Sequence, residues 1–322
     1  MYKISGIKIW SILFFLMFLV ACKEKSDRDN QSQYPETAIT KENDRLYQSE
    51  TFTEPGGFTS GIEGPAVGAD GMLYAVNYQE PGTIGKVTPN GEASLFVTLP
   101  EGSIGNGIRF NSKGEMLIAD YTNHNILKVD MDTKEVSVYA HNEQMNQPND
   151  LAISTNDIIF ASDPDWKKSK GQVWRIDIDG SFTLLEGNMG TANGVEVSAD
   201  DNTLYVNESV QRKVWAYDLS PEGDISNKRL LIEFDDHGMD GMRADIEGNL
   251  YITRHGKGTV VKVSPSGEVL EEITLSGKTP SNIAFGGEEG KTVFITLQDN
   301  GNIESFEVEN PGREFEMKMD HL

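Results

Sequence analysis

The chain has 322 residues, of which 37% are hydrophobic and spread along the sequence, so it is long enough to bury a large core. Its 51 acidic and 28 basic residues give a formal net charge of −23. An electric field of this sign repels polyphosphates and argues against a nucleic-acid partner, but it is compatible with a divalent cation or a small uncharged substrate.

The N-terminus is typical of a bacterial lipoprotein signal. Two lysines precede the apolar run of residues 9–20, which is shorter than a membrane span, and the segment LVAC at 19–22 resembles a lipobox. Cys22 is the only cysteine, which excludes an intramolecular disulfide. We expect residues 1–21 to be removed as a signal peptide and Cys22 to be lipidated. The protein would then be exported and held on the periplasmic or cell-surface side of a membrane; an uncleaved anchor is the alternative.

Residues 22–47 are polar and charged and cannot bury enough apolar surface to order themselves. We predict a flexible tether here, followed by one folded domain over residues 48–322.

An internal repeat predicts the architecture of that domain. A polar head, a short alternating strand, a Gly/Asn/Asp turn and a buried strand recur six times, at intervals of about 41 to 47 residues. A third strand follows each copy, a fourth is visible in several, and helical periodicity is nearly absent. The sequence therefore predicts an all-β protein, a six-bladed β-propeller of four-stranded antiparallel blades. Residues 48–53 and 314–319 are expected to share the last blade. The heads are Glu63, Asn106, Asn149, Asn193, Asp240 and Ser281.

In a propeller the first strand of every blade lines the central channel, so these heads are expected to converge. Two carboxylates and three amides form an oxygen-rich set that suits a hard cation, Ca²⁺ first, with Mg²⁺, Mn²⁺ or Zn²⁺ as alternatives. Without a cation or a proton, Glu63 and Asp240 would be costly charges that repel each other. The alternative is that the heads bond local backbone groups, which we favour for Asn106 and Ser281.

A family resemblance rests on the same positions. EGP at 63–65, PND at 148–150, NG at 193–194 and DGM at 240–242 resemble the gluconolactonase/regucalcin family of calcium-binding propeller lactonases, over roughly residues 50–310. The resemblance implies that Glu63, Asn193 and Asp240 ligate the metal and that Asp240 also accepts and donates a proton. It implies that Asn149 reaches the metal or its bound water and substrate.

Substrate contacts are expected from Asn149, Asn106 and Gln147. Members of this family that act on sugar lactones often carry Arg two residues before the asparagine of the ND pair, where this chain has Gln147. The substitution removes a fixed charge and a fork of donors, which puts an aldonolactone substrate in doubt.

The expected function is therefore that of a metal-dependent lactonase, in which water attacks a carbonyl polarised by the cation and Asp240 takes the proton. The chain lacks G-x-S-x-G, and none of its five histidines falls in a nucleophile motif. Two alternatives are a phosphoester or phosphofluoridate hydrolase at the same site and a non-catalytic calcium-binding surface propeller. The expected partners are a small lactone or ester and, through the lipid anchor only, a membrane; no protein partner is implied.

Further residues are expected near the predicted channel mouth. The loop at 162–171 carries Trp166 and either covers the channel or packs as an ordinary loop. His255 is interpreted as a solvated loop histidine, and Arg243 and Arg254 as candidate substrate contacts.

Overall fold

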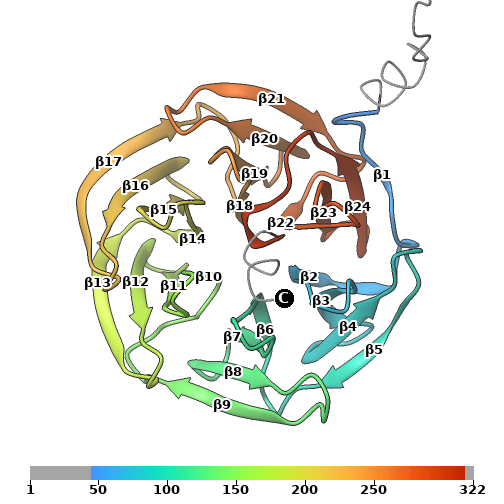
Figure 1. Cartoon of the computed structure of the whole chain (residues 1–322), viewed down its shortest axis with the longest axis horizontal. Helices are drawn as coiled ribbons and strands as arrows, with labels where there is room; N and C mark the ends of the chain where they lie inside the picture. Colours follow the sequence, from blue (N-terminus) through green and yellow to red (C-terminus); the bar gives the residue numbers. More distant parts are fainter. Residues whose placement is uncertain (1–44, 316–322) are drawn as a thin grey trace, which may run out of the picture.

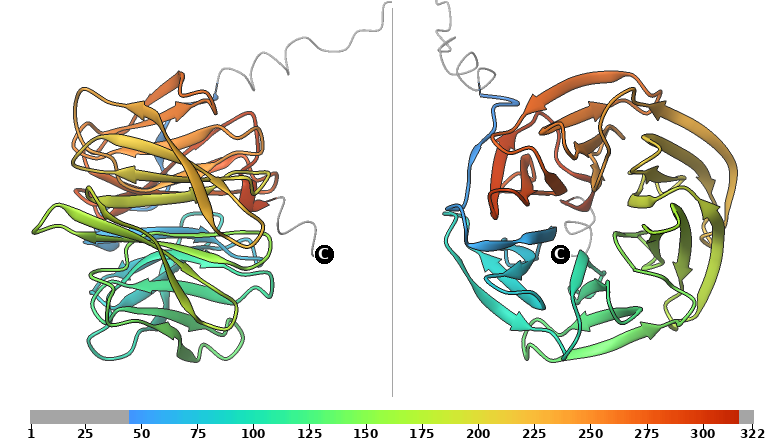
Figure 2. Two further views of the ribbon diagram at one scale, coloured as in Figure 1. Left: turned by 90° about the vertical axis from the view of Figure 1, so that its left-hand side faces the viewer. Right: turned by 180° about the vertical axis from the view of Figure 1, so that it is seen from behind.

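The computed structural model describes residues 45–315 of the chain. The predicted signal peptide at 1–21, the lipidation site Cys22 and most of the predicted tether lie outside the described residues. Within residues 45–315, 24 strands form six four-stranded sheets around a common axis (Figures 1 and 2). The six-bladed β-propeller is confirmed. No helix in residues 45–315 has the length and apolar character needed to cross a bilayer.

Each blade runs from an innermost strand at the axis to an outermost strand at the rim (Figure 1). Blades 1 and 2 consist of β2 (Phe58–Val67), β3 (Leu73–Tyr78), β4 (Thr83–Val87) and β5 (Ala93–Thr98), then β6 (Gly105–Phe110), β7 (Met116–Asp120), β8 (Asn125–Val129) and β9 (Val136–His141). Blades 3 and 4 consist of β10 (Leu151–Ile153), β11 (Ile159–Asp165), β12 (Lys170–Ile176) and β13 (Phe182–Met189), then β14 (Ala192–Val197), β15 (Thr203–Glu208), β16 (Lys213–Leu219) and β17 (Ile225–Glu233). Blades 5 and 6 consist of β18 (Met242–Ala244), β19 (Leu250–Arg254), β20 (Thr259–Val263) and β21 (Val269–Thr274), then β22 (Pro280–Gly286), β23 (Thr292–Leu297), β24 (Asn302–Glu307) and β1 (Glu50–Thr51).

The core lies between neighbouring blades. The second strand of a blade is buried almost throughout, as in β7 and β19, because both faces of the sheet pack against adjacent sheets. Phe160 of blade 3 and Val206 of blade 4, for example, belong to one buried cluster. This explains the continuous apolar runs of the second strands, whereas an outermost strand such as β21 is mostly exposed.

The ring is closed by pairing the two ends of the fold. β1 pairs antiparallel with β24, with Glu50 opposite Ser305, so blade 6 contains strands from both ends. This confirms the prediction that residues 48–53 share the last blade. Tyr47, which precedes the predicted domain boundary, also contacts this blade: its amide donates to the Glu307 carbonyl over 2.9 Å.

The sequence predicts that residues 314–319 share the last blade. The described part of this segment differs, because residues 313–315 form a helical turn; residues 316–319 lie outside the described residues. The Arg313 guanidinium donates to the carbonyl of Ser198 in the loop after β14 (2.9 Å) and to that of Ile153 in β10 (3.0 Å), while the Glu314 carboxylate lies 2.9 Å from Arg109 Nε in β6. This segment therefore braces blades 2, 3 and 4 near the axis.

Candidate functional site

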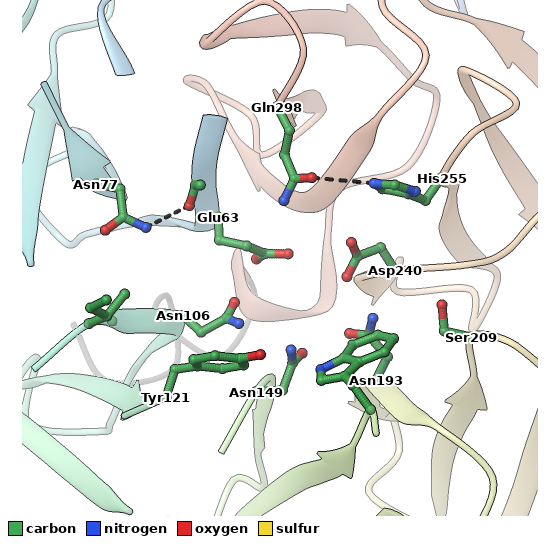
Figure 3. Close-up of a pocket in the computed structure, with 14 residues that line it drawn as sticks. Glu63, Asn77, Asn106, Tyr121, Asn149, Asn193, Ser209, Asp240, His255 and Gln298 are labelled. Atoms are coloured by element: carbon green, nitrogen blue, oxygen red, sulfur yellow. Dashed lines mark hydrogen bonds between the residues drawn. The ribbon is translucent and has the colours of Figure 1, made fainter. Parts of the chain in front are cut away.

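Five of the six predicted heads line one cavity of about 430 Å³ on the axis of the propeller (Figure 3). They come from five different blades: Glu63 lies in the middle of β2, and the other four lie within two residues of the start of the innermost strand. The sixth head, Ser281, does not line the cavity: its hydroxyl donates to the Ile62 carbonyl over 2.8 Å. Ser281 therefore bonds to backbone, as expected, although to that of the neighbouring blade 1, whereas Asn106 belongs to the cavity wall. The five heads in the wall are Glu63, Asn106, Asn149, Asn193 and Asp240.

Glycine follows four of the heads because adjacent blades approach too closely at the hub for a side chain. A Cβ on Gly64 would lie 1.9 Å from the Asn106 carbonyl oxygen, and one on Gly194 would lie 2.5 Å from that of Asp240. At Gly107 the close approach of two blades includes a hydrogen bond, in which the Gly107 amide donates to the Asn149 carbonyl over 2.8 Å. The E-G, N-G and D-G pairs of the repeat thus let each head sit directly against a neighbouring blade.

Glu63 and Asp240 face each other across the floor of the cavity (Figure 3). Glu63 is buried and accepts hydrogen bonds from the Gly64 amide (2.6 Å) and from Asn282 Nδ2 (3.0 Å). Asp240 lies within hydrogen-bonding reach of both the Asn193 side chain and Glu63. Both carboxylates are thus oriented by neutral amides.

Burial governs the protonation of this pair. It raises the pKa of Glu63 to about 7, and the nearby Asp150 carboxylate contributes in the same direction. Burial, and then the charge of Glu63, raises the pKa of Asp240 well above its usual value. Two close carboxyl groups with little solvent cannot both ionise unless a positive charge lies between them.

The oxygen atoms around the pair fit a hard cation. The Oδ1 atoms of Asn106 and Asn193 are buried and have no hydrogen-bond partner among residues 45–315, and Asn193 also lines the cavity floor beside Asp240. A buried carbonyl oxygen left unpaired costs about 1–3 kcal/mol, and ligation of a cation removes that cost. Across the described part of the chain, no three His, Cys, Asp or Glu side chains are grouped to hold a metal. The donor set is therefore two carboxylates and amide oxygens, which is typical of Ca²⁺.

The rim of the cavity consists of six residues that the repeat analysis did not assign to the site. Five of them directly follow the last residue of the second strand of a blade, and the sixth is the last but one residue of β3. Because the first two strands of a blade are antiparallel, the end of the second strand lies beside the start of the first. The position after the second strand in each repeat could therefore have indicated the rim residues. The rim residues are Asn77, Tyr121, Trp166, Ser209, His255 and Gln298.

Three expectations about individual side chains need correction. His255 is not a solvated loop histidine: it lines the cavity, with Nε2 3.3 Å from the Gln298 Oε1 atom (Figure 3). Arg243 is buried and pairs with Asp150 at 3.2 Å. Arg254 is buried over the Phe234 ring, 3.8 Å from its centroid. Neither arginine lines the cavity, so neither is a substrate contact.

Gln147 lies behind the rim rather than in the cavity wall. Its side chain is within hydrogen-bonding reach of the Tyr121 hydroxyl, and its backbone amide donates to Asp163 over 2.6 Å. Trp166 does line the cavity, as expected if the loop at 162–171 covers the channel.

Known proteins resemble this chain in sequence and in fold. Residues 61–299 match the family described as SMP-30/Gluconolactonase/LRE-like region. A gluconolactonase of Zymomonas mobilis is 29% identical over 274 residues, covering 74% of this chain and 76% of that protein. A 6-deoxy-6-sulfogluconolactonase of Pseudomonas putida is 30% identical over 132 residues, covering 40% of this chain and 45% of that protein.

Solved structures share the fold. A regucalcin of Agrobacterium tumefaciens superposes with a TM-score of 0.70 at 19% identity, covering 82% of this chain and 97% of that one. A gluconolactonase of Xanthomonas campestris superposes with a TM-score of 0.69 at 20% identity, covering 81% and 89%. The family match spans most of the propeller and includes all five heads of the cavity wall. The chain therefore belongs to the SMP-30/gluconolactonase/LRE-like family.

Proposed function

We propose that the protein is a divalent-cation-dependent lactonase that opens a small lactone ring at the hub of the propeller. The observation that carries the proposal is the facing pair Glu63 and Asp240, which can both ionise only with a positive charge between them, beside an Asn193 amide oxygen that has no partner among residues 45–315. The gluconolactonases among its relatives support the reaction class.

The cation, Ca²⁺ in this proposal, would be held by Glu63, Asn193 and Asp240, with Asn149 and Asn106 at the side where substrate enters. When bound, it would supply a positive charge that polarises a carbonyl and stabilises the developing oxyanion. The cavity above the floor is large enough for a small lactone.

Asp240 acts as the proton acceptor. The Asn193 amide orients its carboxylate, and the side chain is partly exposed in the cavity, so a water molecule can reach it. Water adds to the carbonyl carbon while Asp240 takes its proton. The bond from that carbon to the ring oxygen then breaks, and the proton passes to the ring oxygen, which leaves a hydroxy acid.

Two other functions make different demands on the same residues. A phosphoester or phosphofluoridate hydrolase would use the same cation and heads. A non-catalytic calcium-binding propeller needs the cation but no cavity above it, and the open cavity lined by Trp166 and Tyr121 therefore favours hydrolysis. We further propose that the protein is an exported lipoprotein anchored through Cys22, on the basis of its N-terminal sequence alone.

A panel of lactones, aryl esters and phosphotriesters tests the proposal, assayed in EDTA and again after Ca²⁺ is restored. We expect lactone hydrolysis that disappears in EDTA and returns with Ca²⁺. Glu63→Gln and Asp240→Asn should each lower kcat/KM for lactones by at least about 100-fold, in line with the loss of a base or of charge stabilisation. Glu271→Gln, an exposed acid on β21, is the matched control. Lactone turnover that both site variants retain would exclude this mechanism.

A further inference from the structure

Trp166 is an unusual residue in the cavity wall. It directly follows β11, and its side chain is 39% exposed. Among residues 45–315, nine large hydrophobic side chains are exposed, and only Trp166 of these lines the axial cavity. An exposed aromatic ring at the mouth of a polar site is a surface available to a ligand.

The ring is held in place at its edge. The Trp166 side chain and the Gln147 side chain both lie within hydrogen-bonding reach of the Tyr121 hydroxyl. The loop that carries Trp166 is itself tied down, since the Lys168 amide donates to Asp165 over 3.1 Å and its Nζ atom pairs with the same carboxylate at 2.8 Å. Tyr121 and Trp166 therefore form one aromatic part of the cavity wall, open to a ligand.

Charge limits what this wall can accept. Among residues 45–315, no Lys or Arg lines the cavity, and the floor carries two carboxylates. Lys168 beside Trp166 is exposed and already paired with Asp165. A phosphate or sulfonate on the substrate would thus find no Lys or Arg side chain in the wall to pair with, whereas an uncharged group needs no such partner.

We propose that Tyr121 and Trp166 form a subsite for a planar, uncharged substituent that lies outside the lactone ring being opened. Tyr121 lies on the side of the cavity next to Asn106 and Asn149, across from His255 and Gln298 (Figure 3). A ring opened above Glu63 and Asp240 therefore has its substituent within reach of the aromatic wall. This inference rests on the proposed function for the placement of the lactone, but binding to the wall is measurable without hydrolysis.

Binding is tested with two lactams that cannot be opened as lactones are. Dihydroquinolin-2-one and δ-valerolactam differ by one fused benzene ring and mimic the lactones dihydrocoumarin and δ-valerolactone. Calorimetry on the Ca²⁺-loaded full chain should show about tenfold tighter binding of the bicyclic lactam, which corresponds to one good aromatic contact. Trp166→Ala should abolish this preference, Trp166→Phe should restore part of it, and Lys168→Ala in the same loop should leave it unchanged.

Hydrolysis of the two matching lactones supplies the second arm. The ratio of kcat/KM for dihydrocoumarin to that for δ-valerolactone should fall about tenfold in Trp166→Ala relative to the wild type. If the lactam preference is present but neither lactone is hydrolysed, the subsite stands and the proposed lactonase function fails. If the preference is absent in the wild type, if neither lactam binds, or if Trp166→Ala retains the preference, the subsite is refuted.

Discussion

The carboxylates of Glu63 and Asp240 face each other across the floor of the cavity although they belong to the first and fifth blades (Figure 3). The hydrogen-bond donors that contact them are neutral: the Gly64 amide and Asn282 for Glu63, and Asn193 for Asp240. A buried pair of this kind is stable only with a shared proton or a cation, so the hub of the propeller is built to hold positive charge.

Removing one of these charges should weaken the stabilisation by Ca²⁺ and make the cation-free protein more stable. We expect Ca²⁺ at 100 times its dissociation constant to stabilise the wild type by about 2.7 kcal/mol and Glu63→Gln or Asp240→Asn by far less. In EDTA at pH 8 the order should reverse, with both variants more stable than the wild type, because the repulsion is gone. Thermal unfolding with and without Ca²⁺ measures both effects. The exposed control Glu271→Gln should behave as the wild type, and site variants that keep the full Ca²⁺ shift would show that the cation binds elsewhere.

The raised pKa of Glu63 should make the stability of the cation-free protein fall with increasing pH. The carboxyl titrates near 4.5 in the unfolded chain and near 7 in the folded protein. Between these values the folded protein holds a proton that the unfolded chain has lost, so this contribution to the free energy of unfolding is lost as pH rises from 4.5 to 7. Asp240 acts in the same direction.

Urea denaturation in EDTA between pH 5 and pH 8 measures this decline. Glu63→Gln should show a shallower slope than the wild type, and saturating Ca²⁺ should flatten the wild-type slope because the cation binds the ionised pair. Equal slopes in the wild type and Glu63→Gln would show that Glu63 titrates normally.

A methyl group on Gly194 should disturb the site without touching its charges. The added Cβ would lie 2.5 Å from the Asp240 carbonyl oxygen and 2.5 Å from Asn207 Nδ2, which donates to that same oxygen. The main chain of Asp240 must therefore move, and a displacement of about 1 Å at a catalytic group lowers turnover by about 100-fold. Lactone kinetics of Gly194→Ala measure the effect. Gly57→Ala is the control, since its Cβ meets only the Glu54 carbonyl oxygen at an ordinary 3.6 Å. Normal kcat/KM in Gly194→Ala would mean that the hub is less tightly packed than the structure indicates.

The floor of the site was predictable from the sequence because it is part of the repeat. Identical positions in each copy must meet at the axis of a propeller, so Glu63 and Asp240 could be paired without a structure. Backbone bonding was the interpretation favoured for Ser281, but its acceptor, the Ile62 carbonyl, lies in blade 1, and the repeat does not encode this contact between blades 6 and 1.

The rim was missed for a different reason. Its residues, such as Tyr121 and His255, share a position at the end of the second strand but no residue type, so they look like ordinary loop residues in sequence. The turn at Arg313 was also unpredictable, because its partners Ile153 and Ser198 lie in distant blades and no local pattern links them.

The brace formed by Arg313 should contribute strongly to stability. Its side chain is 3% exposed, donates to two backbone carbonyls of blades 3 and 4, and pairs with Asp201. Arg313→Ala removes a donor from each of the Ser198 and Ile153 carbonyls and the cationic partner of Asp201, so we expect a loss of about 3 kcal/mol in the free energy of unfolding by urea. Arg229→Ala is the matched control: its pair with Asp218 is half exposed on both sides and should contribute less than about 1 kcal/mol. If both variants lose the same small amount of unfolding free energy, the contacts of Arg313 do not contribute to the stability of the blades. A large loss confined to Arg313→Ala would show that the chain end holds together the blades on which Asn149 and Asn193 are positioned.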